Sequence, residues 1–364
     1  MSRAKYTHPT SAVPSPSHAR ARRTSLVLFL VLSLVVAIGL ICAAYRRDLR
    51  VAGDRSTAGS RIAQTPCGPI EYSVLGQGVP ILVVHGAGGG FDQGLRFAAP
   101  LAERGFRIVA MSRFGYLRTP LPNDASAEAQ AAAHVCLLDA LHIRRIAIIG
   151  ASAGAPSSML FALRYPERTV ALILLVPAAY VPRPDHGAPL KVAPGTELAF
   201  NTALRSDFVL WAATRVARRT LVQALLATPP QVVDAASPAE QERVAMMLES
   251  ILPVSARRLG LKNDAAVTAT LPRYDLEHIV APTLAISVAD DLFGTFDAAR
   301  YTAEHIVGAR FIGYPNGGHV LVGHQEDVFK QIATFLSLRE TGDVSPTTAD
   351  WAPNRRARSV ESKL

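Results

Sequence analysis

One stretch near the middle of the chain constrains its fold more than any other. Residues 146–149 are apolar, residues 150–154 read Gly-Ala-Ser-Ala-Gly, and residues 155–163 are again mostly apolar. The pattern predicts a short buried strand, a turn of very small residues and a helix. Because passing from strand to helix in so few residues crowds the backbone, the positions that flank Ser152 must be small. Such a turn presents Ser152 beside a helix N-terminus, where free backbone N–H groups favour negative charge.

Strand-like and helix-like segments alternate on both sides of this turn. Mostly apolar runs, typical of strands buried on both faces of a parallel sheet, occur at 80–84, 107–111, 145–149, 171–176 and 282–287. The alternation predicts an α/β fold with a mostly parallel central sheet and helices on both of its faces. It stops between residues 180 and 275, where only helical patterns occur, so we expect a helical insertion there.

The positive charge of the chain lies in its ends. The formal net charge is +9, of which residues 1–61 carry +8, whereas residues 62–338 contain 23 basic and 23 acidic residues. A neutral core argues against a nucleic-acid-binding domain, whose basic face would appear in this count. A chain of 364 residues with 49% hydrophobic residues can bury a sizeable core, as one large domain or two ordinary ones.

An uncharged apolar segment lies close to the N-terminus. Residues 24–45 contain no charged residue, and as a helix they would span about 33 Å, the thickness of a bilayer core. We interpret them as an uncleaved single-pass transmembrane helix, although the small residues Ala43 and Ala44 leave cleavage open. Five basic residues precede the segment and five follow it, so charge hardly discriminates its orientation. We expect the main domain on the extracytoplasmic side.

The three cysteines are too few for a disulfide scaffold. No C-x-x-C motif or His/Cys cluster suggests a metal site. A bridge between Cys67 and Cys136 would be permitted in an oxidising compartment, but spacing does not establish it. Buried free thiols are the preferred interpretation.

A serine hydroxyl becomes a good nucleophile only when a base takes its proton and a third group orients that base. Among ten histidines, His319 lies in a glycine loop after a predicted strand, at the edge where Ser152 is expected. Asp290 and Asp291 directly follow the strand at 284–287 and reach the same edge. The chain order serine, acid, histidine is that of a nucleophile elbow with its partners.

A second glycine loop, His85 to Gly90, follows the strand at 80–84. The backbone N–H groups near Ala87 or Gly88, with that of Ala153, are candidate donors for a developing oxyanion, and we assign Ala87 and Ala153 to this role. His85 itself is expected to have a structural or pocket-lining role. The loop lacks G-x-G-x-x-G spacing, and no G-K-[ST] follows, so a nucleotide site is not expected.

These motifs together resemble those of α/β-hydrolases with a serine nucleophile and a helical cap. The matching segments are residues 84–89, 150–154, 282–291 and 317–319, and the resemblance covers about residues 66–338. It implies Ser152, Asp291 and His319 as the triad. Residues 288–291 match the G-x-x-D pattern of the family with Val288 in place of the glycine, so the register favours Asp291 and leaves Asp290 as the alternative acid. It also implies a cap at 180–275 over the active site, and no metal or organic cofactor.

The resulting prediction is a membrane-anchored serine hydrolase that acts on a small-molecule carboxylic ester or related acyl substrate through an acyl-enzyme. The alternatives are a carbon–carbon bond, a lactone or an amide as the target of the same triad, or a non-catalytic binding protein on this scaffold. The predicted segments are 1–23 disordered, 24–45 transmembrane, 46–65 linker, 66–179 with 276–338 hydrolase core, 180–275 cap, and 339–364 flexible tail.

Several other residues have two interpretations. Residues 113–116 fit a structural turn better than a pocket wall. Phe208, Trp211 and Met246–Met247 in the cap could contact substrate, but core packing is at least as well supported by their helical spacing. Arg257–Arg258 could bind a carboxylate, although a solvated helix end is the preferred interpretation.

Overall fold

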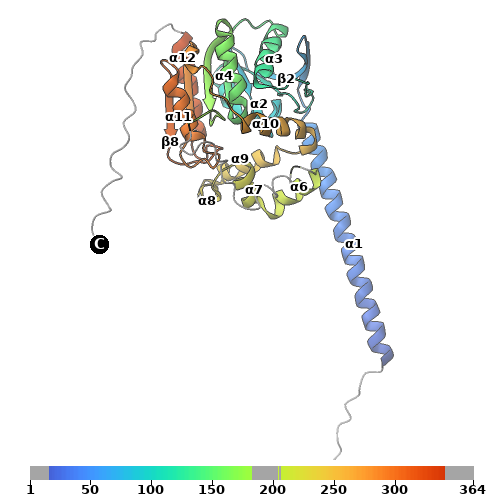
Figure 1. The fold of residues 1–364 in the computed structure, drawn as a ribbon. Coiled ribbons are helices and arrows are strands. Elements are labelled where there is room, and N and C mark those ends of the chain that lie inside the picture. Colours follow the sequence, from blue (N-terminus) through green and yellow to red (C-terminus); the bar gives the residue numbers. More distant parts are fainter. Residues whose placement is uncertain (1–15, 183–203, 205, 341–364) are drawn as a thin grey trace, which may run out of the picture. The chain divides into compact units, whose positions relative to one another are not determined.

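The computed structural model describes residues 16–182, 204 and 206–340 (Figure 1). It divides into two compact units, residues 1–51 and residues 52–364, which we describe separately. The predictions for residues 1–15, for most of 183–205 and for 341–364 lie outside the described residues.

Helix α1 runs from Pro16 to Arg55 and contains a candidate membrane span, Thr24–Arg55. The prediction of disorder is therefore wrong for residues 16–23, and the predicted linker at 46–65 is wrong in two places. Residues 46–55 continue the helix, because they are mostly good helix formers without proline. Residues 61–65 form the edge strand β1. In the second unit, Arg55 Nη2 donates to the carbonyl oxygens of Glu249 and Leu252, each at 3.1 Å.

An eight-stranded sheet forms the centre of the second unit, in the order β1-β2-β4-β3-β5-β6-β7-β8. The first two strands run antiparallel to their neighbours and the other six are parallel. The strands are β1 (Arg61–Thr65), β2 (Gly68–Leu75), β3 (Val79–Val84), β4 (Phe106–Met111), β5 (Ile146–Ala151), β6 (Thr169–Leu175), β7 (Thr283–Val288) and β8 (Arg310–Tyr314). The predicted mostly parallel sheet is confirmed.

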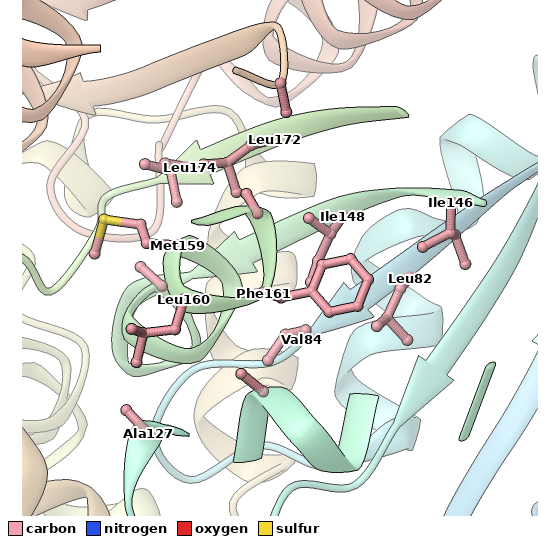
Figure 2. Packing of buried hydrophobic residues seen from close by; sticks show 14 of the residues in the cluster. Leu82, Val84, Ala127, Ile146, Ile148, Met159, Leu160, Phe161, Leu172 and Leu174 are labelled. Carbon is pink, nitrogen blue, oxygen red and sulfur yellow. The ribbon is translucent and has the colours of Figure 1, made fainter. Parts of the chain in front are cut away.

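Helices cover both faces of the sheet. Alternate residues of the buried strands point to opposite faces. Leu82 and Ile148 belong to an apolar layer that also includes residues of α3 (Ala127–Ala140), α4 (Ala155–Arg164) and α11 (Thr295–His305), and Figure 2 shows part of this layer. On the other face, Ile81 and Ile149 belong to an apolar layer that also includes residues of α2 (Phe91–Glu103) and α12 (Gln325–Glu340). Strands buried on both faces explain the apolar runs in the sequence.

Between β6 and β7 the described residues form helices and no strand. These are α6 (Asp207–Val216), α7 (Arg218–Leu225), α8 (Pro230–Asp234), α9 (Pro238–Glu249) and α10 (Arg258–Ala269). Helix α10 is only weakly amphipathic, and its buried residues are Gly260 and Asp264. It carries contacts to the active-site region that are described below.

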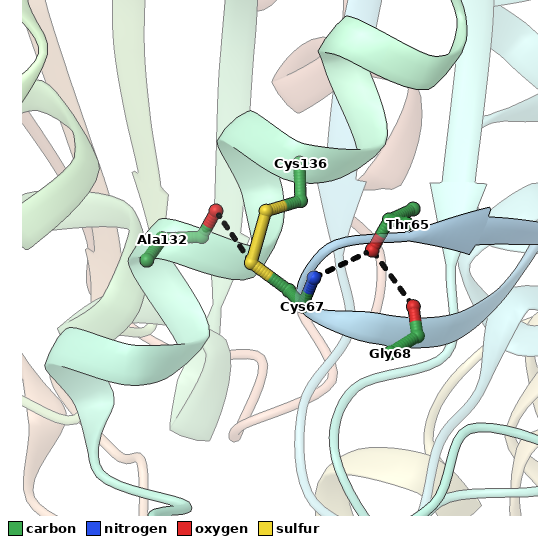
Figure 3. Close-up of a disulfide and its surroundings, with 5 residues drawn as sticks. All are labelled: Thr65, Cys67, Gly68, Ala132 and Cys136. Atoms are coloured by element: carbon green, nitrogen blue, oxygen red, sulfur yellow. Dashed lines mark hydrogen bonds between the residues drawn. A yellow bond between two sulfur atoms is a disulfide. The ribbon is translucent and has the colours of Figure 1, made fainter.

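Cys67 and Cys136 form a disulfide, so the expectation of buried free thiols is wrong (Figure 3). Cys67 lies in the turn between β1 and β2, where its N–H donates to Thr65 Oγ1 at 3.1 Å and its sulfur lies 3.8 Å from the carbonyl oxygen of Ala132. The turn therefore holds Cys67 against α3. The two Cα atoms are 6.1 Å apart, within the usual range for a disulfide.

Candidate active site

The turn after β5 has the geometry that its small residues require. Ser152 has φ = 49°, in the left-handed region that strains a residue other than glycine by about 1–3 kcal/mol. A Cβ at Gly150 would lie 2.6 Å from Ser158 Oγ, and one at Gly154 would lie 2.4 Å from the Val84 carbonyl oxygen. Both positions therefore exclude larger residues, since α4 and β3 pack directly on the turn.

The predicted loops of Asp291 and His319 meet at this turn. Ser152 Oγ lies 2.9 Å from His319 Nε2, and His319 Nδ1 lies 2.8 Å from Asp291 Oδ2. Since the carboxylate only accepts, we assign the proton to Nδ1, which leaves the Nε2 lone pair facing the serine hydroxyl. The arrangement places a base, its orienting carboxylate and a hydroxyl in one hydrogen-bonded chain.

Asp291, not its neighbour Asp290, contacts the imidazole. Burial alone would raise the pKa of Asp291, but attraction to His319 and hydrogen bonds from His319, Thr295 and the Phe293 N–H outweigh it and lower that pKa below its ordinary value. Asp290 accepts instead from the Gly318 N–H at 2.8 Å. The two carboxylates therefore act on one loop in different ways: Asp291 orients the histidine ring and Asp290 fixes the backbone before it.

A cavity of about 180 Å³ opens onto Ser152 and His319. Its described lining includes no Asp, Glu, Lys or Arg, and most of it is apolar, with Leu225, Met247 and Ile251 supplied by the helical segment. Ala87 lies on the same wall, while Ala153 follows Ser152 in a short 3₁₀ turn and is buried. Of the cap residues considered from sequence, Met247 reaches the cavity, whereas the described lining does not include Phe208 or Trp211.

Two buried ion pairs lie beside the cavity, and sequence reasoning found neither. Arg257 is fully buried and binds Asp92 of α2, so the interpretation of Arg257 as part of a solvated helix end is wrong. Arg113 binds Asp264 of α10 through two 2.6 Å contacts. Tyr116 donates its hydroxyl to the same aspartate. Residues 113–116 thus have the structural role that was expected of them.

His85 is buried, and the hydrogen-bond partners of its two ring nitrogens are backbone groups. Its Nδ1 lies 2.7 Å from the Gly86 carbonyl oxygen, and its Nε2 accepts the Arg113 N–H at 3.0 Å. Burial, followed by the positive charge of Arg113, lowers the pKa of His85 well below its ordinary value. The imidazole is therefore neutral at neutral pH, which suits a structural role.

Comparison with known proteins supports the same architecture. A family model for the alpha/beta hydrolase fold matches residues 79–323. The chain belongs to the alpha/beta hydrolase fold family. Among similar proteins, an uncharacterized hydrolase of Bacillus subtilis, YcgS, is 29% identical over 265 residues, which cover 70% of this chain and 89% of the relative. The structure of an alpha/beta hydrolase fold protein from Nakamurella multipartita has a TM-score of 0.55 at 25% identity and covers 78% of this chain and 100% of that one.

A further relative is a 2-hydroxy-6-oxononadienedioate/2-hydroxy-6-oxononatrienedioate hydrolase of Paraburkholderia xenovorans. It is 27% identical over 286 residues, which cover 74% of this chain and 90% of the relative. The family and the names of these relatives support a hydrolase. Among the described residues, no group of three or more His, Cys, Asp or Glu side chains is arranged to hold a metal ion.

Proposed function

We propose that this protein is a serine hydrolase that cleaves an uncharged carboxylic ester through an acyl-enzyme. The observation that carries the proposal is the hydrogen-bonded chain from Ser152 to His319 to Asp291, at 2.9 and 2.8 Å. The strained backbone of Ser152 supports it, because such strain is concentrated at functional sites.

In the acylation step, Ser152 Oγ attacks the ester carbonyl carbon while His319 Nε2 takes the hydroxyl proton. Asp291 stabilises the imidazolium that forms, since its pKa is held low and it stays ionised. The backbone N–H groups of Ala87 and Ala153 are the proposed donors to the oxyanion. As the tetrahedral intermediate collapses, the carbon–oxygen bond breaks and His319 gives its proton to the departing alcohol.

Water completes the reaction along the reverse proton path. His319 removes a proton from the water molecule, and the resulting hydroxide attacks the acyl carbon. The bond to Ser152 Oγ then breaks, Ser152 recovers its proton from His319, and a carboxylic acid leaves. No charged group other than the triad is needed for these steps.

The cavity favours a neutral substrate over an ionised one. Its described lining carries no charged side chain, and the nearby arginines, Arg113 and Arg257, are both committed to buried aspartates. A substrate carboxylate would lose its hydration there without gaining a partner, which is costly. We therefore propose an ester with an apolar acyl group, for which the helical segment acts as the cap.

Cleavage of a carbon–carbon bond by the same triad is the second candidate, favoured by the name of the Paraburkholderia relative. That name specifies a dicarboxylate, which needs cationic partners that the described lining lacks. The two candidates are separated by assaying p-nitrophenyl esters of increasing acyl length against a 2-hydroxy-6-oxo-dienedioate. We expect turnover of the esters, lost in Ser152→Ala. Turnover of the dienedioate alone would reverse the choice.

We also propose that α1 is a single-pass anchor and that the hydrolase domain lies on the extracytoplasmic side. The apolar span and the Cys67–Cys136 disulfide support this, because disulfides persist in oxidising compartments. A C-terminal alkaline phosphatase fusion should be active, and a C-terminal fluorescent protein that requires the cytoplasm should be dark. The opposite pair of results would place the domain inside.

A further inference from the structure

Arg257 holds the loop between β3 and α2, residues 85–90. This arginine lies in the turn before α10, and its guanidinium donates to the Gly89 carbonyl oxygen at 2.5 Å. The same guanidinium contacts both oxygens of Asp92, at 3.2 and 2.8 Å. Since Asp92 stands in the first turn of α2, Arg257 joins the end of the loop to the helix that follows it.

A second network of buried side chains also holds this loop. Arg113 Nε donates to the His85 carbonyl oxygen at 2.8 Å, while its two terminal nitrogens bind Asp264. The Gly88 N–H donates to the Tyr116 hydroxyl at 3.2 Å, and that hydroxyl donates to Asp264 as well. Two backbone groups of the loop thus depend on one carboxylate of α10.

Ala87 lies between these fixed points. The carbonyl groups of His85 and Gly89 and the N–H of Gly88 are all bound to buried side chains, so the path of the chain through Ala87 is determined from both ends. Arg257, Asp92, Arg113 and Asp264 are all buried, and none of them lines the cavity. Their effect on a substrate must therefore pass through the loop.

We propose that Arg257 and Asp264 are positioning residues for the acyl-transfer step, which set the Ala87 N–H at the place where the oxyanion develops. This inference rests on the proposed function. Bidentate arginine–carboxylate pairs have a defined geometry, so they fix the relative positions of the two side chains in addition to pairing their charges. A misplacement of about 1 Å at a reacting group can reduce the rate about 10²-fold.

The test uses Arg257→Lys, which keeps the positive charge but cannot make the bidentate contact to Asp92. Ester turnover is measured per active site titrated with a fluorophosphonate, so that misfolded protein does not count. We expect kcat to fall about 10²-fold with KM nearly unchanged, and the rate constant of fluorophosphonate labelling to fall in parallel, since the phosphonyl oxygen occupies the same site. Arg300→Gln, in an exposed pair on α11, is the matched control and should match the wild type.

Tyr116→Phe is the second variant, because it leaves no unpaired charge and is expected to fold. It should lower kcat per titrated site about tenfold, the effect of one lost hydrogen bond. If both variants keep wild-type kcat per titrated site and only unfold at a lower temperature, the residues are merely structural and the proposal is wrong. If the wild type itself shows neither labelling at Ser152 nor ester turnover, the proposed function fails, and the proposal fails with it.

Discussion

Two glycine-containing loops flank Ser152, and the protein holds them in different ways. The loop after β3 is fixed by buried pairs: the side chains of Arg257 and Asp92 are 0% and 4% exposed. The loop after β8 is held by Arg243 and Glu240 of α9, whose side chains are 16% and 22% exposed. Arg243 donates to the Val320 carbonyl oxygen at 3.0 Å, and Glu240 accepts the Gly323 N–H at 2.9 Å.

The difference corresponds to what each loop supplies in the proposed mechanism. The first loop contributes a backbone N–H, which only the path of the chain can place. The second contributes the imidazole of His319, which Asp291 orients directly through a hydrogen bond. A loop that acts through its backbone therefore needs the more rigid support, whereas a loop that acts through a side chain can rely on a partner for that side chain.

The largest expected effect concerns the orientation of the histidine in the second loop. Asp291→Asn keeps the shape of the residue but lets the amide favour the wrong imidazole tautomer, and we expect kcat to fall about 10⁴-fold. Asp290→Asn, which leaves the imidazole contact intact, is the control and should reduce kcat far less. Steady-state kinetics on a p-nitrophenyl ester measure both. Equal losses in the two variants would mean that the imidazole is not oriented by Asp291 alone.

The next effect concerns the stability of the first loop. Asp92→Ala leaves the Arg257 guanidinium buried without its partner, and we expect the free energy of unfolding to fall by about 3–5 kcal/mol. The double variant Asp92→Asn with Arg257→Gln removes both charges and should lose less. Urea unfolding of each variant gives these values. A loss below about 1 kcal/mol in Asp92→Ala would show that the pair behaves like a surface pair.

The pH dependence of stability offers a second test of the first loop. His85 has its pKa lowered well below the ordinary value by burial and by Arg113, and burial likewise lowers the pKa of His134 to about 3. Below about pH 6.5 the unfolded chain binds protons at these histidines while the folded chain does not, so stability falls as pH falls.

Each such histidine contributes at most about 1.4 kcal/mol per pH unit below pH 6.5. His85→Gln keeps one donor and one acceptor, and it should remove the share of this slope that belongs to His85. Unfolding free energies at pH 7, 6 and 5 provide the measurement. If the variant had the same slope of stability against pH as the wild type, His85 would bind protons equally in the folded and unfolded states over this pH range.

The smallest effect is expected for the supporting pair of the second loop. Because Glu240 and Arg243 are partly exposed, Glu240→Gln should cost about 1 kcal/mol or less of unfolding free energy. Urea unfolding beside Asp92→Ala tests the comparison directly. A loss for Glu240→Gln as large as that for Asp92→Ala would remove the distinction between the two loops.

The sequence predicts the parts of the site that depend on local pattern. The apolar and very small residues around Ser152 predict the strand, the turn and the helix there. The loops that carry Asp291 and His319 are predicted because each comes directly after a predicted strand. Since parallel strands bring their carboxyl ends to one edge, their meeting follows from the fold. The sequence favours Asp291 over Asp290 only through its register with the family pattern, because the turn geometry that brings one carboxylate to the imidazole does not follow from residue spacing.

The remaining features depend on contacts between residues far apart in the chain. Arg257 and Asp92 are 165 residues apart, and Arg113 and Asp264 are 151 apart, so no local pattern indicates either pair. From sequence alone, an exposed position is expected for Arg257, because charged residues are rarely fully buried unless they are paired. The Cys67–Cys136 disulfide likewise depends on how the β1–β2 turn lies against α3.

The account depends most on Ser152 as the nucleophile, and covalent labelling tests this directly. Full-length protein is treated with a fluorophosphonate, digested and analysed by mass spectrometry. We predict one adduct, on the peptide that contains Ser152, which is absent in Ser152→Ala and forms far more slowly in His319→Ala. An adduct on another residue, or equal labelling of the wild type and Ser152→Ala, would contradict the proposed mechanism.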